Sequence, residues 1–261
     1  MKVYALSDIH VDYPENLQWL LSIDDELYQQ DVMILAGDVS DNIDLLRQVF
    51  VSLKSKFREV LFVPGNHELW VHNDEVDCSL LKFDLIQSLC RELGVRDSLF
   101  EHEEISFVPL LSWYDFSFGE PDRHLRRAWR DFKACSWPNH LQDSQSISEH
   151  FLEQNIPLLD TRNRFVISFS HFVPRIDVMP ERIPLDRRRV YPVLGASDLG
   201  DQIARLNPDV HVYGHSHVNQ SITLDDIHFV NNAFAYPTEQ RIARKRLHCI
   251  FDLDEARSNA A

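Results

Sequence analysis

Short apolar runs alternate with amphipathic stretches in the first part of the chain. Residues 2–8 (KVYALSD), 31–38 (DVMILAGD) and 59–66 (EVLFVPGN) are rich in Val, Ile, Leu and Phe, which is typical of strands covered on both faces. Between them, residues 15–30 and 42–57 repeat apolar side chains at helical spacing, so we expect a helix in each. This strand–helix–strand–helix–strand order predicts an α/β fold.

The second half of the chain repeats the strand pattern and then changes it. Residues 105–113, 164–171 and 209–215 are again apolar runs, whereas residues 221–234 (SITLDDIHFVNNAF) predict a hairpin and residues 246–253 (RLHCIFDL) a last strand. We therefore expect a mixed architecture in which antiparallel strands finish a second sheet. Because no internal repeat, low-complexity tract or interdomain linker interrupts the 261 residues, we interpret residues 1–261 as a single domain.

Five of the apolar runs end in side chains that can bind a metal ion. Ligands of open α/β sheets bind beyond the carboxyl ends of the strands, which is where these residues stand. Gly37, Gly65 and Gly214 accompany them, and glycine there lets the backbone turn sharply and approach a site. The polar residues are Asp8 and His10 in SDIH, Asp38 in AGD, Asn66 and His67 in PGNHE, His171 in FSHF, and His215 and His217 in GHSH.

Each of these groups also has an ordinary explanation when it is taken alone. Asp8 and His10 can form a turn, Gly37–Asp38 is common in loops, and His171 can be a buried core histidine. Five strand ends would have to carry suitable ligands by accident, however, so we interpret them jointly as a metal site. Carboxylates, an amide and imidazoles without a thiolate suit Mn, Fe or Zn ions, and the set is large enough for two ions.

In their order along the chain, the blocks DIH, GD, GNHE, SH and GHSH resemble the calcineurin-like metallophosphoesterase superfamily, over roughly residues 2–73 and 164–236. The resemblance implies a sandwich of two mixed β-sheets flanked by helices. It also implies that His67 contacts the substrate, and that two divalent or trivalent ions (Mn, Fe or Zn) are bound. The implied ligands are Asp8, His10 and His217 for one ion, Asn66, His171 and His215 for the other, and Asp38 as a bridge between them.

This resemblance further implies hydrolysis of phosphate esters, either diesters or monoesters. A hydroxide bridging the ions would attack phosphorus, and His67 would protonate the leaving group. Asp41 is either a hydrogen-bond acceptor for the neighbouring imidazoles or the cap of a surface helix. Since Asn42 and Ile43 follow Asp41, the Gly-Asp-x-x-Asp-Arg-Gly block of the protein phosphatases is incomplete, and Gly-His-x-His is closer to the phosphodiesterase-like branch. The alternative is a non-catalytic scaffold of the same fold, which should lack ligands or purify without metal.

Residues 74–163 carry none of the motif positions, so we expect this insert, with residues 172–200, to determine the substrate. In PDRHLRRAWRDFK, helical spacing predicts that Arg123, Arg126, Arg127 and Arg130 share one face. This face is either a solvated surface or a clamp for phosphate groups. Trp113, in SWYDF, either stacks on the substrate or packs in the core.

The net charge of the chain limits the kinds of molecule that it can bind. With 26 basic and 41 acidic residues the formal net charge is −15, which argues against binding to nucleic acid or to an anionic membrane through a basic surface. Bound cations can still attract a small phosphorylated substrate. No run approaches the ~20 apolar residues of a membrane span, and the start does not have the pattern of a signal peptide. The four scattered cysteines, without CxxC spacing, are interpreted as free thiols of a cytoplasmic protein.

Overall fold

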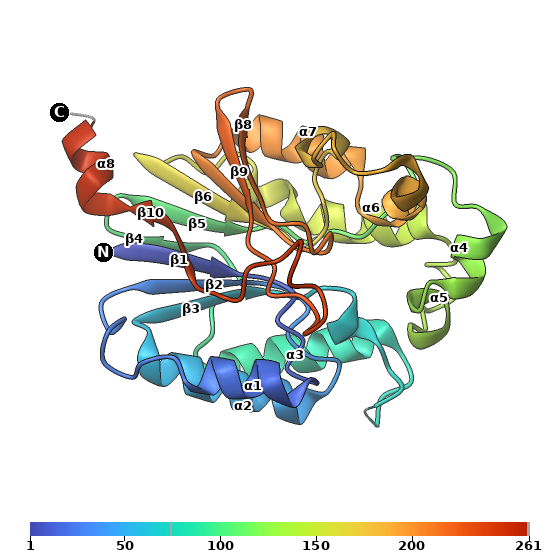
Figure 1. Ribbon diagram of the computed structural model, residues 1–261, viewed down its shortest axis with the longest axis horizontal. Helices are drawn as coiled ribbons and strands as arrows, with labels where there is room; N and C mark the ends of the chain where they lie inside the picture. Colours follow the sequence, from blue (N-terminus) through green and yellow to red (C-terminus); the bar gives the residue numbers. More distant parts are fainter. Residues whose placement is uncertain (74, 260–261) are drawn as a thin grey trace.

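Two β-sheets face one another in the computed structural model, which describes residues 1–73 and 75–259 (Figure 1). The first has the order β10-β1-β2-β3 and consists of β1 (Lys2–Leu6), β2 (Val32–Ala36), β3 (Glu59–Val63) and β10 (His248–Asp252). The second has the order β4-β5-β6-β7-β9-β8 and consists of β4 (Phe100–His102), β5 (Ile105–Pro109), β6 (Phe165–Phe169), β7 (Val210–Tyr213), β8 (Gln220–Leu224) and β9 (Ile227–Asn231). The predicted α/β architecture with two mixed sheets is confirmed.

Parallel pairing dominates the centre of each sheet. Strands β1, β2 and β3 are parallel, as are β5, β6, β7 and β9, while β4 and β8 pair antiparallel at the two edges of the second sheet. We expected the last strand to finish the second sheet together with the hairpin, and this was wrong for β10, which pairs antiparallel with β1. There it covers an edge whose backbone N–H and C=O groups would otherwise lack partners.

The central core lies between the two sheets and explains the unbroken apolar runs. Ile34 of β2, Phe107 of β5 and Val212 of β7 meet there, and every residue of β2 is buried because helices cover its other face. As Figure 1 shows, α1 (Pro14–Leu21), α2 (Ile43–Lys56) and α3 (Ser79–Leu93) cover the first sheet, and α6 (Ser144–Asn155) and α7 (Ser197–Leu206) lie against the second.

The first two predicted helices differ in outcome. Helix α2 matches its expected range, because the Asn42 side chain caps it by accepting from the backbone N–H groups of Asp44 and Leu45. Helix α1 was expected to continue to residue 30 but ends at Leu21. Beyond it, the Asp24 carboxylate accepts from the backbone N–H groups of residues 26 and 27, which replaces helical hydrogen bonds with a local turn.

The arginine-rich helix of the insert is also shorter than expected. It is divided into α4 (Arg123–Ala128) and α5 (Asp131–Ala134), because Trp129 between them is extended, with ψ of 124°. The four arginines of this stretch therefore do not share one continuous helical face. Short 3-10 helices and a terminal helix complete the described chain: η1 (His67–Leu69), η2 (Ile156–Leu158), η3 (Ile176–Val178), η4 (Leu185–Val193) and α8 (Leu253–Asn259). Among the described residues, no helix has the length and apolar character needed to cross a membrane.

Candidate metal centre

The segments that follow β1, β2, β3, β6 and β7 meet at the carboxyl ends of the two sheets. They bring together two groups of side chains whose potential ligand atoms lie within 4.8 Å of one another. All of these side chains are buried, and the two groups share Asp38. The first group is Asp8, His10, Asp38 and His217, and the second is Asp38, His171 and His215. Asn66 adjoins the second group, since its Oδ1 atom lies 3.2 Å from His171 Nε2.

The backbone at these strand ends is strained. Left-handed φ angles, which non-glycine residues avoid, recur at five of the candidate ligands: Asp8 (51°), His10 (44°), Asp38 (54°), His215 (65°) and His217 (55°). Such conformations cost about 1–3 kcal/mol each and persist where the surroundings hold them, often at functional sites. Here the backbone N–H of Asp8 donates to Gly37 O at 2.9 Å, and that of His10 to Asp38 O at 3.0 Å. These bonds join the loop after β1 to the loop after β2.

Two glycines allow the loops to approach so closely. A Cβ atom at Gly65 would lie 2.2 Å from Asp38 Oδ1, which no side chain can occupy. At Gly37, φ is +79° and a Cβ atom would lie 2.5 Å from His171 Nδ1. Glycine at these positions is therefore part of the geometry that places Asp38 and His171 together.

Backbone carbonyls fix the tautomers of two imidazoles. A carbonyl only accepts, so His171 Nδ1 donates to Ala36 O at 2.9 Å and His215 Nε2 donates to Val193 O at 2.9 Å. In the neutral rings the other nitrogens, His171 Nε2 and His215 Nδ1, then both carry lone pairs, yet they lie only 3.0 Å apart. Two lone pairs facing each other at this distance repel unless a cation accepts both, so these residues fit a metal ion.

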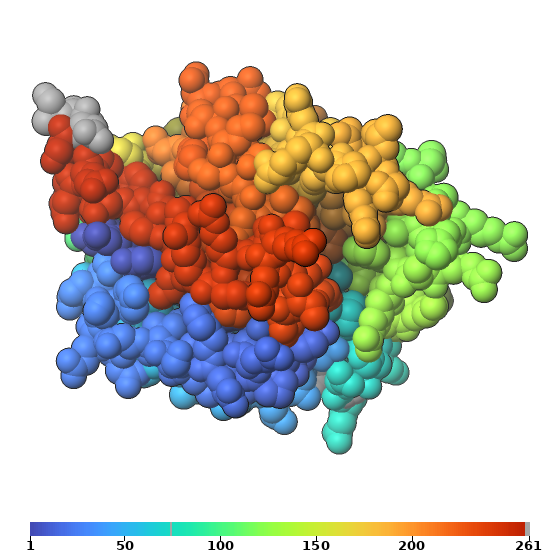
Figure 2. All heavy atoms as spheres, in the orientation of Figure 1, coloured from blue at the N-terminus to red at the C-terminus, as the bar shows by residue number. Residues whose placement is uncertain are grey.

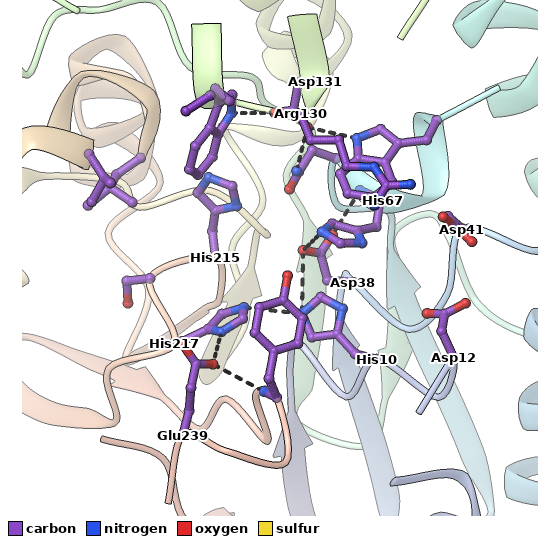
Figure 3. A pocket seen from close by; sticks show the side chains of 18 of the residues that line it. His10, Asp12, Asp38, Asp41, His67, Arg130, Asp131, His215, His217 and Glu239 are labelled. Carbon is purple, nitrogen blue, oxygen red and sulfur yellow. Dashed lines mark hydrogen bonds and ion pairs between the residues drawn. The ribbon is translucent and has the colours of Figure 1, made fainter. Parts of the chain in front are cut away.

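The other pair of imidazoles has a similar arrangement. The ring of His217 places Nδ1 2.6 Å from Glu239 Oε2 and turns Nε2 toward His10 Nε2, 3.1 Å away. A carboxylate that holds the outer nitrogen of a ligating histidine is common at metal sites, because it fixes the ring and raises its basicity. In Figure 3, His10 and His217 lie next to each other, with Glu239 directly below His217.

Electrostatics also suit a cation at this place. Burial lowers the pKa of His10, His171 and His215, the last to about 3, so these rings are neutral and able to bind metal. Burial, followed by the nearby carboxylates of Glu68 and Asp8, raises the pKa of Asp38 well above its usual range. Several acidic groups are thus crowded together away from water, and a bound cation would offset their repulsion.

Asp8 and His217 form an ion pair within this cluster. Burial raises the pKa of Asp8, but attraction to His217 outweighs burial and lowers the pKa to about 2. Burial likewise lowers the pKa of His217, but Asp8 and Glu239 outweigh it and raise the pKa to about 9. Without a metal ion, the proton on His217 therefore supplies the positive charge that Asp8 requires.

Glu68, whose role the sequence did not indicate, connects the loops after β2 and β3. It is fully buried, and its carboxylate accepts from four backbone N–H groups, at distances of 2.6 to 3.1 Å. The donors are those of Gly65, Asp38, Val39 and Ser40. The final residue of GNHE thus holds both ligand-bearing loops in one arrangement.

Asp131, in α5 of the insert, was also missed. Its carboxylate is 3% exposed and accepts from Asn66 Nδ2 at 2.8 Å, from Trp70 Nε1 at 2.7 Å and from Trp129 Nε1 at 2.7 Å. Because the amide nitrogen of Asn66 faces Asp131, its oxygen is directed toward His171. The insert therefore orients a candidate ligand as well as two aromatic rings.

A cavity of about 540 Å³ opens over this cluster. His67 lines it with a side chain that is 13% exposed (Figure 3). Its ring lies against that of Trp70, with centroids 3.7 Å apart and the planes tilted by 30°. The walls of the cavity include four aromatic residues and three acidic ones: Tyr13, Trp70, Trp129, Tyr236, Asp12, Asp41 and Glu239. Arg130 is the one arginine among its described lining residues.

Of the residues that the sequence suggested as substrate contacts, only some line the cavity. Arg130 lines the cavity, with its guanidinium over the Trp70 ring, whereas Arg123 and Arg127 are exposed and are not among the lining residues. Trp113 is 1% exposed and packs against Tyr114, Trp137 and Phe172, so the structure places it in the core, away from the cavity.

Asp41 does line the cavity, but it does not accept from the clustered imidazoles. Its carboxylate accepts from Asn73 Nδ2 at 2.9 Å and lies 3.3 Å from His72 Nε2. His72 Nε2 is in turn 3.0 Å from Arg130 Nη2, so Asp41 belongs to a network at the rim of the cavity.

Comparisons with known proteins agree with this geometry. Residues 1–219 match the model of a family described as calcineurin-like phosphoesterase. The [acyl-carrier-protein] phosphodiesterase PptH of Mycobacterium tuberculosis is 25% identical over 283 residues, covering 92% of this chain and 79% of the relative. The crystal structure of phosphopantetheinyl hydrolase PptH from the same organism superimposes with a TM-score of 0.82 at 22% identity, covering 97% of each chain, which shows a shared fold.

Proposed function

Because this chain belongs to the calcineurin-like phosphoesterase family, we propose that it is a phosphodiesterase that uses two metal ions. The proposed ligands are Asp8, His10 and His217 for one ion, Asn66, His171 and His215 for the other, and Asp38 for both. The observation that carries the proposal is the convergence of two buried ligand groups on one shared carboxylate beneath an open cavity. Metal-dependent hydrolysis of phosphate esters is common to the family. The number of ions and the diester preference are our additions.

The protein's own side chains have separate roles in this proposal. When bound, divalent ions lower the pKa of water and stabilise negative charge on phosphoryl oxygens. Asp8 and Asp38 offset part of the positive charge, and Glu68 keeps Asp38 in place. His67 faces the cavity and is neutral, because burial and the neighbouring histidines hold its pKa well below the usual range. Its ring N–H is then available to donate a hydrogen bond to a phosphate oxygen or to the departing oxygen. The extra proton that the sequence resemblance implied for His67 is not held by a ring with so low a pKa.

The charge of the cavity walls supports a diester as the substrate. Beyond the proposed ligands, the carboxylates of Asp12, Asp41 and Glu239 line the cavity, with Arg130 as the arginine facing them. A diester carries one negative charge and a monoester dianion two, so these carboxylates repel a monoester more strongly. The aromatic walls offer apolar contact to the organic part of the substrate.

The relatives suggest what that organic part is. These relatives are an [acyl-carrier-protein] phosphodiesterase and a phosphopantetheinyl hydrolase. We extend this to the present chain and propose that its phosphodiester joins a phosphopantetheine-like arm to a protein. Such a substrate is larger than the small phosphorylated molecule expected from the sequence alone. We treat residues 74–163 as an insert of a single domain that supplies one wall of the cavity, through Trp129, Arg130 and Asp131. We also place the enzyme in the cytoplasm, since its four cysteines are free thiols.

A paired-substrate assay tests the proposal. Metal-free protein is reconstituted with Mn²⁺ and assayed on bis-p-nitrophenyl phosphate and p-nitrophenyl phosphate, next to a His67→Ala variant. We expect turnover only with metal, a higher kcat/KM on the diester, and a loss of about 10²–10³-fold in the variant without loss of bound metal. A protein that binds no metal and hydrolyses neither compound would instead be a scaffold of this fold.

A further inference from the structure

A second cavity, of about 650 Å³, lies next to the metal centre and has the opposite charge. Arg182, Arg241, Arg244, Arg246 and His248 line it, and no Asp or Glu is found among its described lining residues. The protein as a whole carries a formal charge of −15. Basic side chains are therefore concentrated in this cavity, although the chain as a whole is acidic.

These four arginines have no carboxylate partner within the described part of the chain. Other arginines do, such as Arg47 with Glu92 and Arg205 with Asp160. Residues 182, 241, 244 and 246 take part in none of the ion pairs among the described residues, and all four are exposed. Their guanidinium groups are thus free to bind an external anion, and their planar fork suits carboxylates in particular.

Hydrogen bonds hold the segment that carries Arg241, Arg244 and Arg246 in a defined position. Asn232 Nδ2 donates to Ala5 O at 2.9 Å and to Arg246 O at 3.0 Å, which ties this segment to the end of β1. The backbone N–H of Arg244 donates to Asn219 Oδ1 at 2.5 Å. Arg244 and Arg246 consequently stand on a fixed backbone, which lowers the entropy lost when an anion binds.

The two cavities are separated by the same two chain segments. His217 and Glu239 line the metal cavity, while their immediate neighbours Val218 and Gln240 line the basic cavity. Figure 2 shows residues near 240 (red) and near 185 (gold) on one face of the molecule. A protein seated over the basic cavity would therefore be close enough to extend a flexible arm into the metal cavity.

We propose that the basic cavity docks an acidic surface of a protein substrate and so directs its phosphodiester arm to the metal centre; this inference rests on the function proposed above. The carboxylates of the substrate pair with Arg182, Arg241, Arg244 and Arg246. Elsewhere the negative surface of the enzyme repels an acidic partner, so the basic cavity selects the docking position as well as adding affinity.

The test compares Arg241→Gln/Arg244→Gln with a matched control, Arg123→Gln/Arg127→Gln, whose arginines are exposed but line neither cavity. The substrates are an acidic acyl carrier protein bearing phosphopantetheine, and bis-p-nitrophenyl phosphate. We expect the first variant to raise KM for the carrier protein about tenfold or more with little change in kcat, and to leave the small diester unaffected. The control should match the wild type on both substrates.

Calorimetric binding of the apo carrier protein, which has no phosphodiester to hydrolyse, separates docking from catalysis. Binding that is weakened by high salt and by Arg241→Gln/Arg244→Gln supports the docking site even if the enzyme assay fails. If the wild type hydrolyses the small diester but binds no carrier protein, docking is overturned while the proposed function stands. Equal affinity in the wild type and this variant also overturns it.

Discussion

The floor and the insert wall of the metal cavity are built in different ways. The floor consists of strand ends, where five residues adopt left-handed backbone angles and backbone hydrogen bonds join one loop to the next. The wall from the insert consists of side chains, with one buried carboxylate, Asp131, and one exposed arginine, Arg130. The comparison indicates that the ligand positions depend mainly on a rigid backbone, whereas the wall contributes individual side chains, of which Asp131 supports a candidate ligand and Arg130 lines the cavity.

Asp38→Ala should produce the largest effect, because both ligand groups of the floor share this carboxylate. We expect the protein to lose both bound ions and kcat to fall by at least about 10³-fold. His215→Ala, which removes a ligand atom from one group only, should retain one ion per chain. Elemental analysis of purified variants counts the ions. Loss of the same single ion in both variants would contradict a shared ligand.

Asp131→Asn tests how far the wall supports the floor. The new amide cannot accept from three donors as the carboxylate does, so the orientation of Asn66 is no longer fixed. We expect the affinity for one of the two ions to fall about 10–100-fold, as is typical when a partner of a metal ligand is lost. Metal titration provides the readout. As a control, Asp122→Asn changes an exposed carboxylate of the same insert and should leave metal affinity unchanged.

His211, in β7 beneath the floor, makes stability depend on pH. Burial lowers its pKa to about 3, against 6.5 for an ordinary histidine, while Nδ1 and Nε2 contact the Ser168 and Ser170 hydroxyls. Between these two values the unfolded state binds the extra proton, so stability falls as the pH drops below about 6.5. From pH 7 to pH 5 this one group should lower the free energy of unfolding by about 2 kcal/mol.

Denaturant unfolding at both pH values tests the role of His211. The free energy of unfolding of His211→Gln should fall by about 2 kcal/mol less than that of the wild type over this interval. Substitution of the exposed His140 should not change the loss, and an equal loss in both variants would refute this explanation.

Arg130→Gln should have the smallest effect, confined to substrate binding. The guanidinium lines the cavity next to Trp70, so its loss should raise KM for a phosphodiester by about tenfold and leave metal content unchanged. Arg127→Gln, in the same stretch but outside the cavity, should behave as the wild type. Equal KM values for both variants and the wild type would show that Arg130 does not contact the substrate.

The strand positions and the polar residues at their ends could be predicted from sequence, for physical reasons. A strand covered on both faces must be apolar throughout, as in β2, and this leaves a continuous signal. Polar residues directly after such a run must then lie at the edge of the sheet. Asp38 and His171 could therefore be placed near each other although they are far apart in the chain.

Features that depend on tertiary contacts could not be predicted from the sequence. The end of α1 follows from an Asp24 turn that competes with apolar spacing, and the break at Trp129 accompanies a hydrogen bond from its indole to Asp131. Asp131 has partners on two other segments, at Asn66 and Trp70, so nothing in its immediate sequence indicates its role. Four basic residues stand close together in RIARKR (241–246), but the cavity could not be expected from them alone, because it forms only when four stretches of the chain meet.

The most direct test of the account is the number and coupling of the bound ions. Metal-free wild-type protein is titrated with Mn²⁺, with calorimetry to count sites and electron paramagnetic resonance to detect exchange between neighbouring ions. If Asp38 is shared as proposed, two Mn²⁺ bind per chain and the spectrum is that of a coupled pair. One ion per chain, or two ions with independent spectra, would contradict a two-metal centre built around Asp38.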